Sequence, residues 1–147
     1  MVSGRKDALD QLAGTAKAAG ARKVIPLAVS GAFHTPLVES ALPALKDALE
    51  ATPWHAPDPA FFSACTVGFE SGDFAGLLQR QLVSPVRFSQ SVNALFAAGY
   101  DSFLEVGPGA VLTGLVKRVE PQAQVTRVSD METLAALRAD GRYLEAT

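Results

Sequence analysis

One histidine stands at a point of the chain where a catalytic base could be presented. His34 follows the mostly apolar run 24–29, which leads into Gly31 and has the pattern of a buried strand. After it, Thr35 can cap a helix and Pro36 suits the first helical position. The positive end of a helix dipole disfavours an imidazolium, and a general base requires a neutral ring. From this pattern alone, a histidine that only hydrogen-bonds a loop stays an open alternative.

Three segments of the chain carry motifs that occur together in one family. They are residues 29–37 (VSGAFHTPL), 79–88 (QRQLVSPVRF) and 103–115 (FLEVGPGAVLTGL). In this order they resemble the histidine, glutamine-leucine…proline-valine and Glu-Val-Gly-Pro-Gly segments of malonyl-CoA:acyl carrier protein transacylases and related acyltransferase domains of fatty acid and polyketide synthases. Three matches spread over most of the chain are far more specific than any lone motif.

The resemblance places the chain in the carboxyl-terminal half of such an enzyme. It implies an α/β fold: the carboxyl-terminal part of a mainly parallel, hydrolase-like acyltransferase core over 30–147, preceded by a remnant of a ferredoxin-like small subdomain over 1–29. The alternation of apolar patterns agrees with an α/β protein. Helices are expected at 5–19, 37–49, 73–82, 88–98, 110–119 and 132–138, and strands at 1–4, 22–29, 60–66, 101–106 and 125–128. Pro43 implies a kink or a helix start near Ser40, and the tail from 140 is expected to be loose.

The resemblance also assigns roles to residues. His34 would be the catalytic base, at the carboxyl edge of the parallel sheet. The backbone carbonyl of Gln81 would accept a hydrogen bond from one ring nitrogen, about 2.7–3.2 Å away, in place of the acid of a Ser-His-Asp triad. Phe33 resembles the bulky residue of malonyl-selective members and is expected to line a groove that the other ring nitrogen faces. From the sequence alone, Gln81 is an ordinary glutamine near a helix end.

The chain departs from the family pattern in its nucleophile. The family carries a serine in a Gly-His-Ser-Leu-Gly elbow and a carboxylate-binding arginine beyond it, and no G-x-S-x-G occurs in these 147 residues. The expectation is therefore part of an acyltransferase that moves malonyl from coenzyme A to acyl carrier protein, inactive alone, with the missing amino-terminal half as a further candidate partner. The alternatives are a non-catalytic interaction fragment or degenerate paralogue and, less favoured by the motifs, a serine hydrolase.

Four basic residues could contact the acidic acyl carrier protein, and they could equally be the solvated ends of a strand and a helix. They are Arg22, Lys23, Lys117 and Arg118. Trp54 and His55 are expected to pack within a proline-rich loop. The turn 107–109 is expected to be a tight connection, with anion binding at helix amides as its alternative.

Charge and composition narrow the function classes. A net charge of −2 gives no electrostatic footprint for nucleic acid or an anionic membrane. The apolar runs are too short to span a bilayer and no signal peptide is evident, so the cytosol is the expected location. The single cysteine, Cys65, excludes an internal disulfide and a cysteine-based zinc site, and it is expected to be a buried strand thiol. No metal or cofactor is expected, with coenzyme A thioester as substrate. An isolated chain is expected to expose apolar surface and to self-associate.

Overall fold

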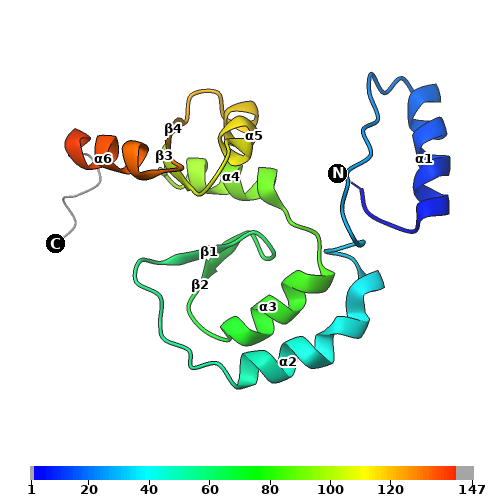
Figure 1. Cartoon of the computed structure of the whole chain (residues 1–147), viewed down its shortest axis with the longest axis horizontal. Coiled ribbons are helices and arrows are strands. Elements are labelled where there is room, and N and C mark those ends of the chain that lie inside the picture. The colour runs from blue at the N-terminus through cyan, green and yellow to red at the C-terminus, as the bar shows by residue number, and fades with distance from the viewer. Residues whose placement is uncertain (1, 142–147) are drawn as a thin grey trace. The chain divides into compact units, whose positions relative to one another are not determined.

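Helices and short strands alternate along the chain, as expected of an α/β protein (Figure 1). The computed structural model describes residues 2–141, which form two compact units, one up to Val86 and one from Arg87 onward. No helix among these residues is long and apolar enough to span a bilayer. The division of the sequence at residues 29 and 30 stays a prediction.

The first unit is mainly helical. Its elements are α1 (Lys6–Ala18), the 3-10 helix η1 (Pro36–Ala41), α2 (Leu42–Glu50), β1 (Phe61–Ser63), β2 (Gly68–Glu70) and α3 (Phe74–Val83). The helical spacing over 37–49 is thus divided between η1 and α2, close to the break that Pro43 predicts, because a proline has no N–H to continue a helix. Helix α3 packs against α2 and η1.

The start of α3 is fixed by one side chain. Asp73 adopts a left-handed conformation (φ 47°) and its carboxylate accepts a hydrogen bond from the N–H of Gly76 at 3.0 Å. A Cβ at position 76 would clash with that carboxylate, so a larger residue there would displace the cap. These contacts set where α3 begins.

The predicted strand at 22–29 is wrong for the described residues, as is the strand at 1–4 over residues 2–4. As far as they are described, both segments lack regular structure and a ladder partner, and the N–H of Val29 donates to the carbonyl of Leu27 at 3.0 Å. A strand exists only through hydrogen bonds to a neighbour, so an apolar run by itself does not make one. Ile25, Leu27 and Val29 are 62%, 58% and 65% exposed. The apolar surface expected of the isolated chain is therefore present here, whereas its self-association stays a prediction.

The strand predicted at 60–66 is a hairpin instead. Strand β1 pairs antiparallel with β2, which the sequence did not predict, and Phe62 meets Phe69 edge to face at 5.1 Å. Residues 64–67 form the turn. Cys65 lies in that turn, half-buried, so the prediction of a buried strand thiol is wrong. Its N–H donates to Ser63 Oγ at 3.1 Å, which ties the turn to β1.

The second unit contains the parallel strands. Its elements are α4 (Phe88–Ala97), β3 (Ser102–Val106), α5 (Val111–Val119), β4 (Gln124–Val128) and α6 (Met131–Asp140). Strands β3 and β4 pair in parallel from Ser102↔Gln124 to Val106↔Val128, joined through α5. Val92, Val116 and Ala123 form the buried core between α4, α5 and the strands. Parallel pairing among the described residues is limited to these two strands, so the mainly parallel sheet predicted is not found.

The last helix predicted from the sequence, over 132–138, is present as α6 and is slightly longer. Helix α6 ends at Asp140, and Gly141 follows in a left-handed conformation (φ 72°) that suits a helix end. The loose tail was expected from Asp140, which is instead the last residue of α6. The rest of that expectation, from residue 142 on, falls outside the described residues.

A carboxylate from β3 caps α5. Glu105 accepts hydrogen bonds from the N–H groups of Leu112 (3.0 Å) and Thr113 (2.9 Å) and from the Thr113 hydroxyl. These hydrogen bonds hold the pKa of the Glu105 carboxyl below its ordinary value. The bond from the Thr113 hydroxyl lowers it most, and desolvation opposes it with a smaller effect than that bond. Gly107 (φ 132°) and Gly109 (φ 95°) let the chain turn between strand and helix.

A side chain also clasps the turn before η1. Thr35 Oγ1 accepts a hydrogen bond from the N–H of Leu37 at 3.2 Å and donates one to the carbonyl of Ala32 at 2.7 Å. Thr35 is the N-cap of η1 and Pro36 takes the first position, as the sequence predicts. The hydrogen bond to Ala32 spans residues 33 and 34, so this clasp of Thr35 holds the turn that carries His34.

We predict that Thr35→Ala lowers the free energy of unfolding of the first unit by about 1 kcal/mol, because it removes a cap and a second hydrogen bond. Thr35→Ser keeps both bonds and is the matched control. Urea unfolding can be followed by fluorescence of Trp54, the only tryptophan, which stacks on Phe74 of α3. Equal stability of the alanine and serine variants would contradict the role given to the hydroxyl.

A second prediction concerns pH. Because the pKa of Glu105 is lower in the folded state, its stabilising contribution is present above its ordinary pKa of 4.5 and is lost as pH falls through the folded value. In Glu105→Gln, the free energy of unfolding of the second unit should therefore fall less steeply as the pH is lowered. Asp130, whose pKa is lowered mainly by hydrogen bonds from Thr133, keeps the curve from becoming level.

Urea titrations at several pH values between about 7 and 3, followed by NMR signals of β3 and β4, measure this effect. Glu132→Gln, which changes an exposed carboxylate in the first turn of α6, is the control. An unchanged acid profile in Glu105→Gln would show that the cap does not contribute through its charge.

Candidate functional site

Two carbonyl groups hold His34 at the end of α3. The backbone N–H of His34 donates to the carbonyl of Leu82 at 3.0 Å, and its ring Nδ1 lies 2.8 Å from the carbonyl oxygen of Gln81. A carbonyl oxygen only accepts hydrogen bonds, so Nδ1 carries the proton in this contact. The distance expected between ring and carbonyl is therefore present, across 47 positions of sequence.

The end of α3 can supply both acceptors because the last four carbonyls of a helix have no intrahelical donor. Gln81 and Leu82 lie in the last turn of α3, and Ser84 after it is extended (φ −115°, ψ 147°). The contribution of Leu82 was missed by the sequence analysis. Its only signal was its place beside Gln81 at a predicted helix end.

His34 itself adopts a left-handed backbone conformation (φ 61°), which is uncommon outside glycine although histidine tolerates it more than most residues. This conformation directs both its N–H and its ring to the same helix end. The hydrogen bonds at backbone and ring, together with the clasp of Thr35, keep it there.

The surroundings of the ring differ from the sequence prediction in two respects. His34 does not follow a strand, so it does not lie at the carboxyl edge of a sheet among the described residues. The helix after it is a six-residue 3-10 turn, whose dipole is small, and the direct contacts of the ring come from α3. The acceptor at Nδ1 fixes the tautomer and leaves Nε2 free to accept a proton.

The side chain of Gln81 plays little part in this arrangement. Its amide nitrogen is 3.5 Å from His34 Nδ1, at the outer limit of a hydrogen bond, whereas the backbone oxygen is 2.8 Å away. The backbone therefore provides the main contact, and any residue except one that distorts the helix could supply it.

Phe33 is half-exposed, with 48% of its surface accessible. A Cβ built on Gly31 would lie 3.7 Å from its ring, so the ring rests over that glycine. The expected groove between Phe33 and the second ring nitrogen of His34 stays a prediction.

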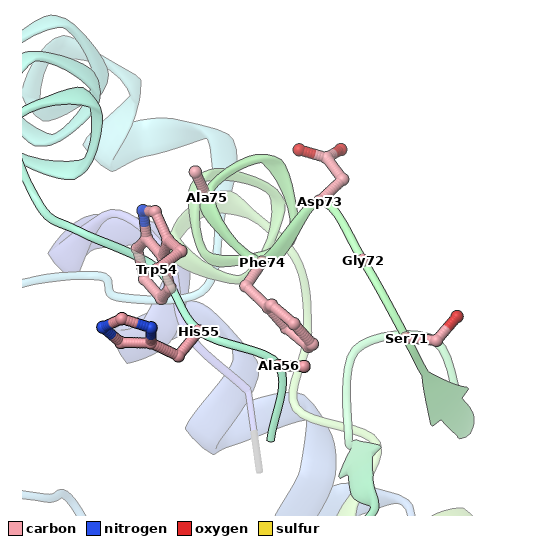
Figure 2. A pocket seen from close by; sticks show the side chains of 8 residues that line it. All are labelled: Trp54, His55, Ala56, Ser71, Gly72, Asp73, Phe74 and Ala75. Atoms are coloured by element: carbon pink, nitrogen blue, oxygen red, sulfur yellow. The ribbon is translucent and has the colours of Figure 1, made fainter.

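A cavity of about 380 Å³ lies elsewhere in the first unit (Figure 2). Figure 2 shows the loop from Trp54 to Ala56 on one side and the start of α3 at Phe74 on the other. Trp54 Nε1 donates to the carbonyl of Leu49 at 3.0 Å, and its ring stacks on Phe74 with centroids 6.4 Å apart. The expected loop packing is thus confirmed for Trp54, and His55 lines the cavity.

The four basic residues fall in different units. Arg22 and Lys23 are exposed on the irregular segment after α1, and Lys117 and Arg118 lie in the last turn of α5. Lys117 Nζ donates to the carbonyl of Ala123 at 2.6 Å, which holds the end of α5 to the loop before β4. A role of these residues in binding a carrier protein stays a prediction.

The contacts after the turn 107–109 favour a tight connection over an anion-binding site. The first amides of α5, which an anion could use, already bind the carboxylate of Glu105. Within residues 2–141, no group of three His, Cys, Asp or Glu side chains is arranged to hold a metal ion.

Comparison with known proteins connects this geometry to a family. A family model described as the acyl transferase domain matches residues 1–146. The chain is 40% identical over 136 residues to the malonyl CoA-acyl carrier protein transacylase of Bacillus subtilis (strain 168), a match that covers 91% of this chain and 43% of that protein.

Solved structures give the same result. The crystal structure of MCAT from Streptococcus pneumoniae matches with a TM-score of 0.85 and 36% identity, over 93% of this chain and 45% of that one. A malonyl-transacylase in complex with a type II PKS acyl-carrier protein matches with a TM-score of 0.84 and 33% identity, over 93% and 45%. The chain spans less than half the length of these relatives, and it belongs to the acyl transferase domain family.

Proposed function

We propose that this chain acts as the carboxyl-terminal part of a malonyl-CoA:acyl carrier protein transacylase and supplies its general base. The observation that carries the proposal is the hydrogen bond from His34 Nδ1 to the carbonyl of Gln81. In the neutral ring this bond leaves Nε2 as the nitrogen without a proton, as a base needs, and it occurs in a chain whose relatives are named for this reaction.

The proposed reaction is an acyl transfer in two steps. A serine hydroxyl from the amino-terminal part of the enzyme attacks the thioester carbonyl of malonyl-CoA while His34 Nε2 takes the hydroxyl proton. The tetrahedral intermediate collapses, coenzyme A leaves as its thiol with that proton, and malonyl-serine remains. The thiol of the carrier protein's phosphopantetheine then attacks this ester, again with His34 as base, and serine regains its proton.

A carbonyl partner has a defined consequence for this base. It orients the ring and fixes its tautomer as the aspartate of a triad does, but it stabilises the imidazolium less than a carboxylate would. We therefore assign Gln81 a positioning role through its backbone and His34 the proton transfer.

Phe33 is the proposed specificity residue. Its ring would crowd an α-methyl branch on the acyl group, a discrimination of typically ~1–3 kcal/mol. A comparison of malonyl-CoA with methylmalonyl-CoA as donor would test this role. The basic residues Arg22, Lys23, Lys117 and Arg118 are proposed contacts for the acidic carrier protein, whose attraction would mainly speed encounter.

We also propose that the chain completes a larger fold of the hydrolase-like type. The uncovered apolar row Ile25, Leu27 and Val29 supports this, as does the two-stranded parallel pair β3–β4, because parallel sheets are normally covered on both faces. In this fold, α1 and the segment 22–29 would belong to a small ferredoxin-like subdomain. The cytosol is the proposed location.

The function can be tested with a chimera in which this chain follows the part of the Bacillus subtilis relative that precedes the matched region. The chimera should transfer labelled malonyl from coenzyme A to acyl carrier protein, whereas the 147-residue chain alone should not, because it has no G-x-S-x-G elbow. His34→Ala in the chimera should lower the rate by about 10²-fold or more, the usual share of a general base.

His55→Ala is the matched control, since it removes the other histidine, which lies at the separate cavity. A folded chimera whose rate is the same with and without His34 would refute the proposed base. Transfer by the 147-residue chain alone would refute the proposed need for a serine from elsewhere.

A further inference from the structure

The position of Pro85 relative to the histidine-binding carbonyls has a specific chemical consequence. In an α-helix, the carbonyl of residue i accepts a hydrogen bond from the N–H of residue i+4. For Gln81 that donor would be residue 85, and proline has no N–H. The carbonyl that binds His34 Nδ1 at 2.8 Å is thus one that a continued helix could not have used.

Pro85 also affects the second carbonyl. The residue before a proline is driven out of the helical region into an extended conformation, and Ser84 has φ −115° and ψ 147°. This ends α3 at Val83 and prevents the N–H of Val86 from reaching the carbonyl of Leu82 as a helix would require. That carbonyl accepts the backbone N–H of His34 instead, at 3.0 Å.

We propose that Pro85 is a positioning residue that reserves the carbonyls of Gln81 and Leu82 for His34. With any other residue at 85, a new N–H would compete for Gln81 and α3 could add a turn. His34 depends on these bonds, because its left-handed backbone conformation is unfavourable without them. The effect of Pro85 on the hydrogen bonds of His34 is independent of the proposed function. Its importance for acyl transfer rests on that function.

The test uses the 147-residue chain with ¹⁵N-labelled histidine. Ring ¹⁵N shifts report which nitrogen carries the proton in the neutral ring, and the His55→Asn variant assigns the signals of the two histidines. Hydrogen exchange of the His34 amide reports its bond to Leu82. In Pro85→Ala, the ratio of the Nδ1–H to the Nε2–H form should fall by about fivefold and the amide should exchange faster by a similar factor, as expected for loss of one hydrogen bond.

Two variants control this measurement. Pro85→Gly also restores an N–H but favours helix less than alanine, so its effect should lie between those of proline and alanine. Pro57→Ala removes an exposed proline from the loop between α2 and β1, and it should change neither signal. Trp54 fluorescence checks that α3 stays packed in each variant, since that ring stacks on Phe74.

An unchanged tautomer ratio and amide exchange in a folded Pro85→Ala variant would overturn the inference. If that variant does not fold, the same result in Pro85→Gly overturns it. Activity of the chimera does not enter this readout. A tautomer shift together with an inactive chimera would therefore support the role of Pro85 while refuting the proposed function.

Discussion

The hydrogen bond between the ring of His34 and the carbonyl of Gln81 is the contact on which the candidate site depends. It joins residues 47 positions apart, so it requires that the end of α3 be placed against the turn before η1. Asp73 sets the start of α3, and packing against α2 and η1 sets its direction. At the other end of α3, the ring of Phe74 stacks on Trp54 and meets Phe61 of β1 edge to face.

The energetics of this turn are a balance of small contributions. A left-handed conformation costs a non-glycine residue roughly 1–2 kcal/mol, and a hydrogen bond contributes about 0.5–1.5 kcal/mol net. His34 makes one bond through its backbone and one through its ring. The ring contact therefore both orients the imidazole and helps to hold an unfavourable backbone conformation. A carboxylate partner would need its own element in the fold, whereas a helix end offers unpaired carbonyls without one.

Local signals predicted the helices well, because capping residues and prolines act within one turn. Thr35, Pro36 and Pro43 each lie at or near the helix boundary that they indicate. The strands were less predictable, because a strand needs a partner that the local sequence does not specify. The apolar run 22–29 is not paired with a neighbour among the described residues, and β2 was missed because its hairpin turn carries no Asn-Gly or Asp-Gly signal. The contact of His34 with Gln81 was predicted by resemblance alone, whereas that with Leu82 required the structure.

A neutron crystal structure near neutral pH would test the central claim most directly, because it locates the proton on the ring of His34. The account predicts a proton on Nδ1, directed at the carbonyl oxygen of Gln81, and no proton on Nε2. A proton on Nε2, with Nδ1 accepting a hydrogen bond from the side-chain amide of Gln81 that lies 3.5 Å away, would contradict it. In that state the ring could not take a proton from a serine through Nε2.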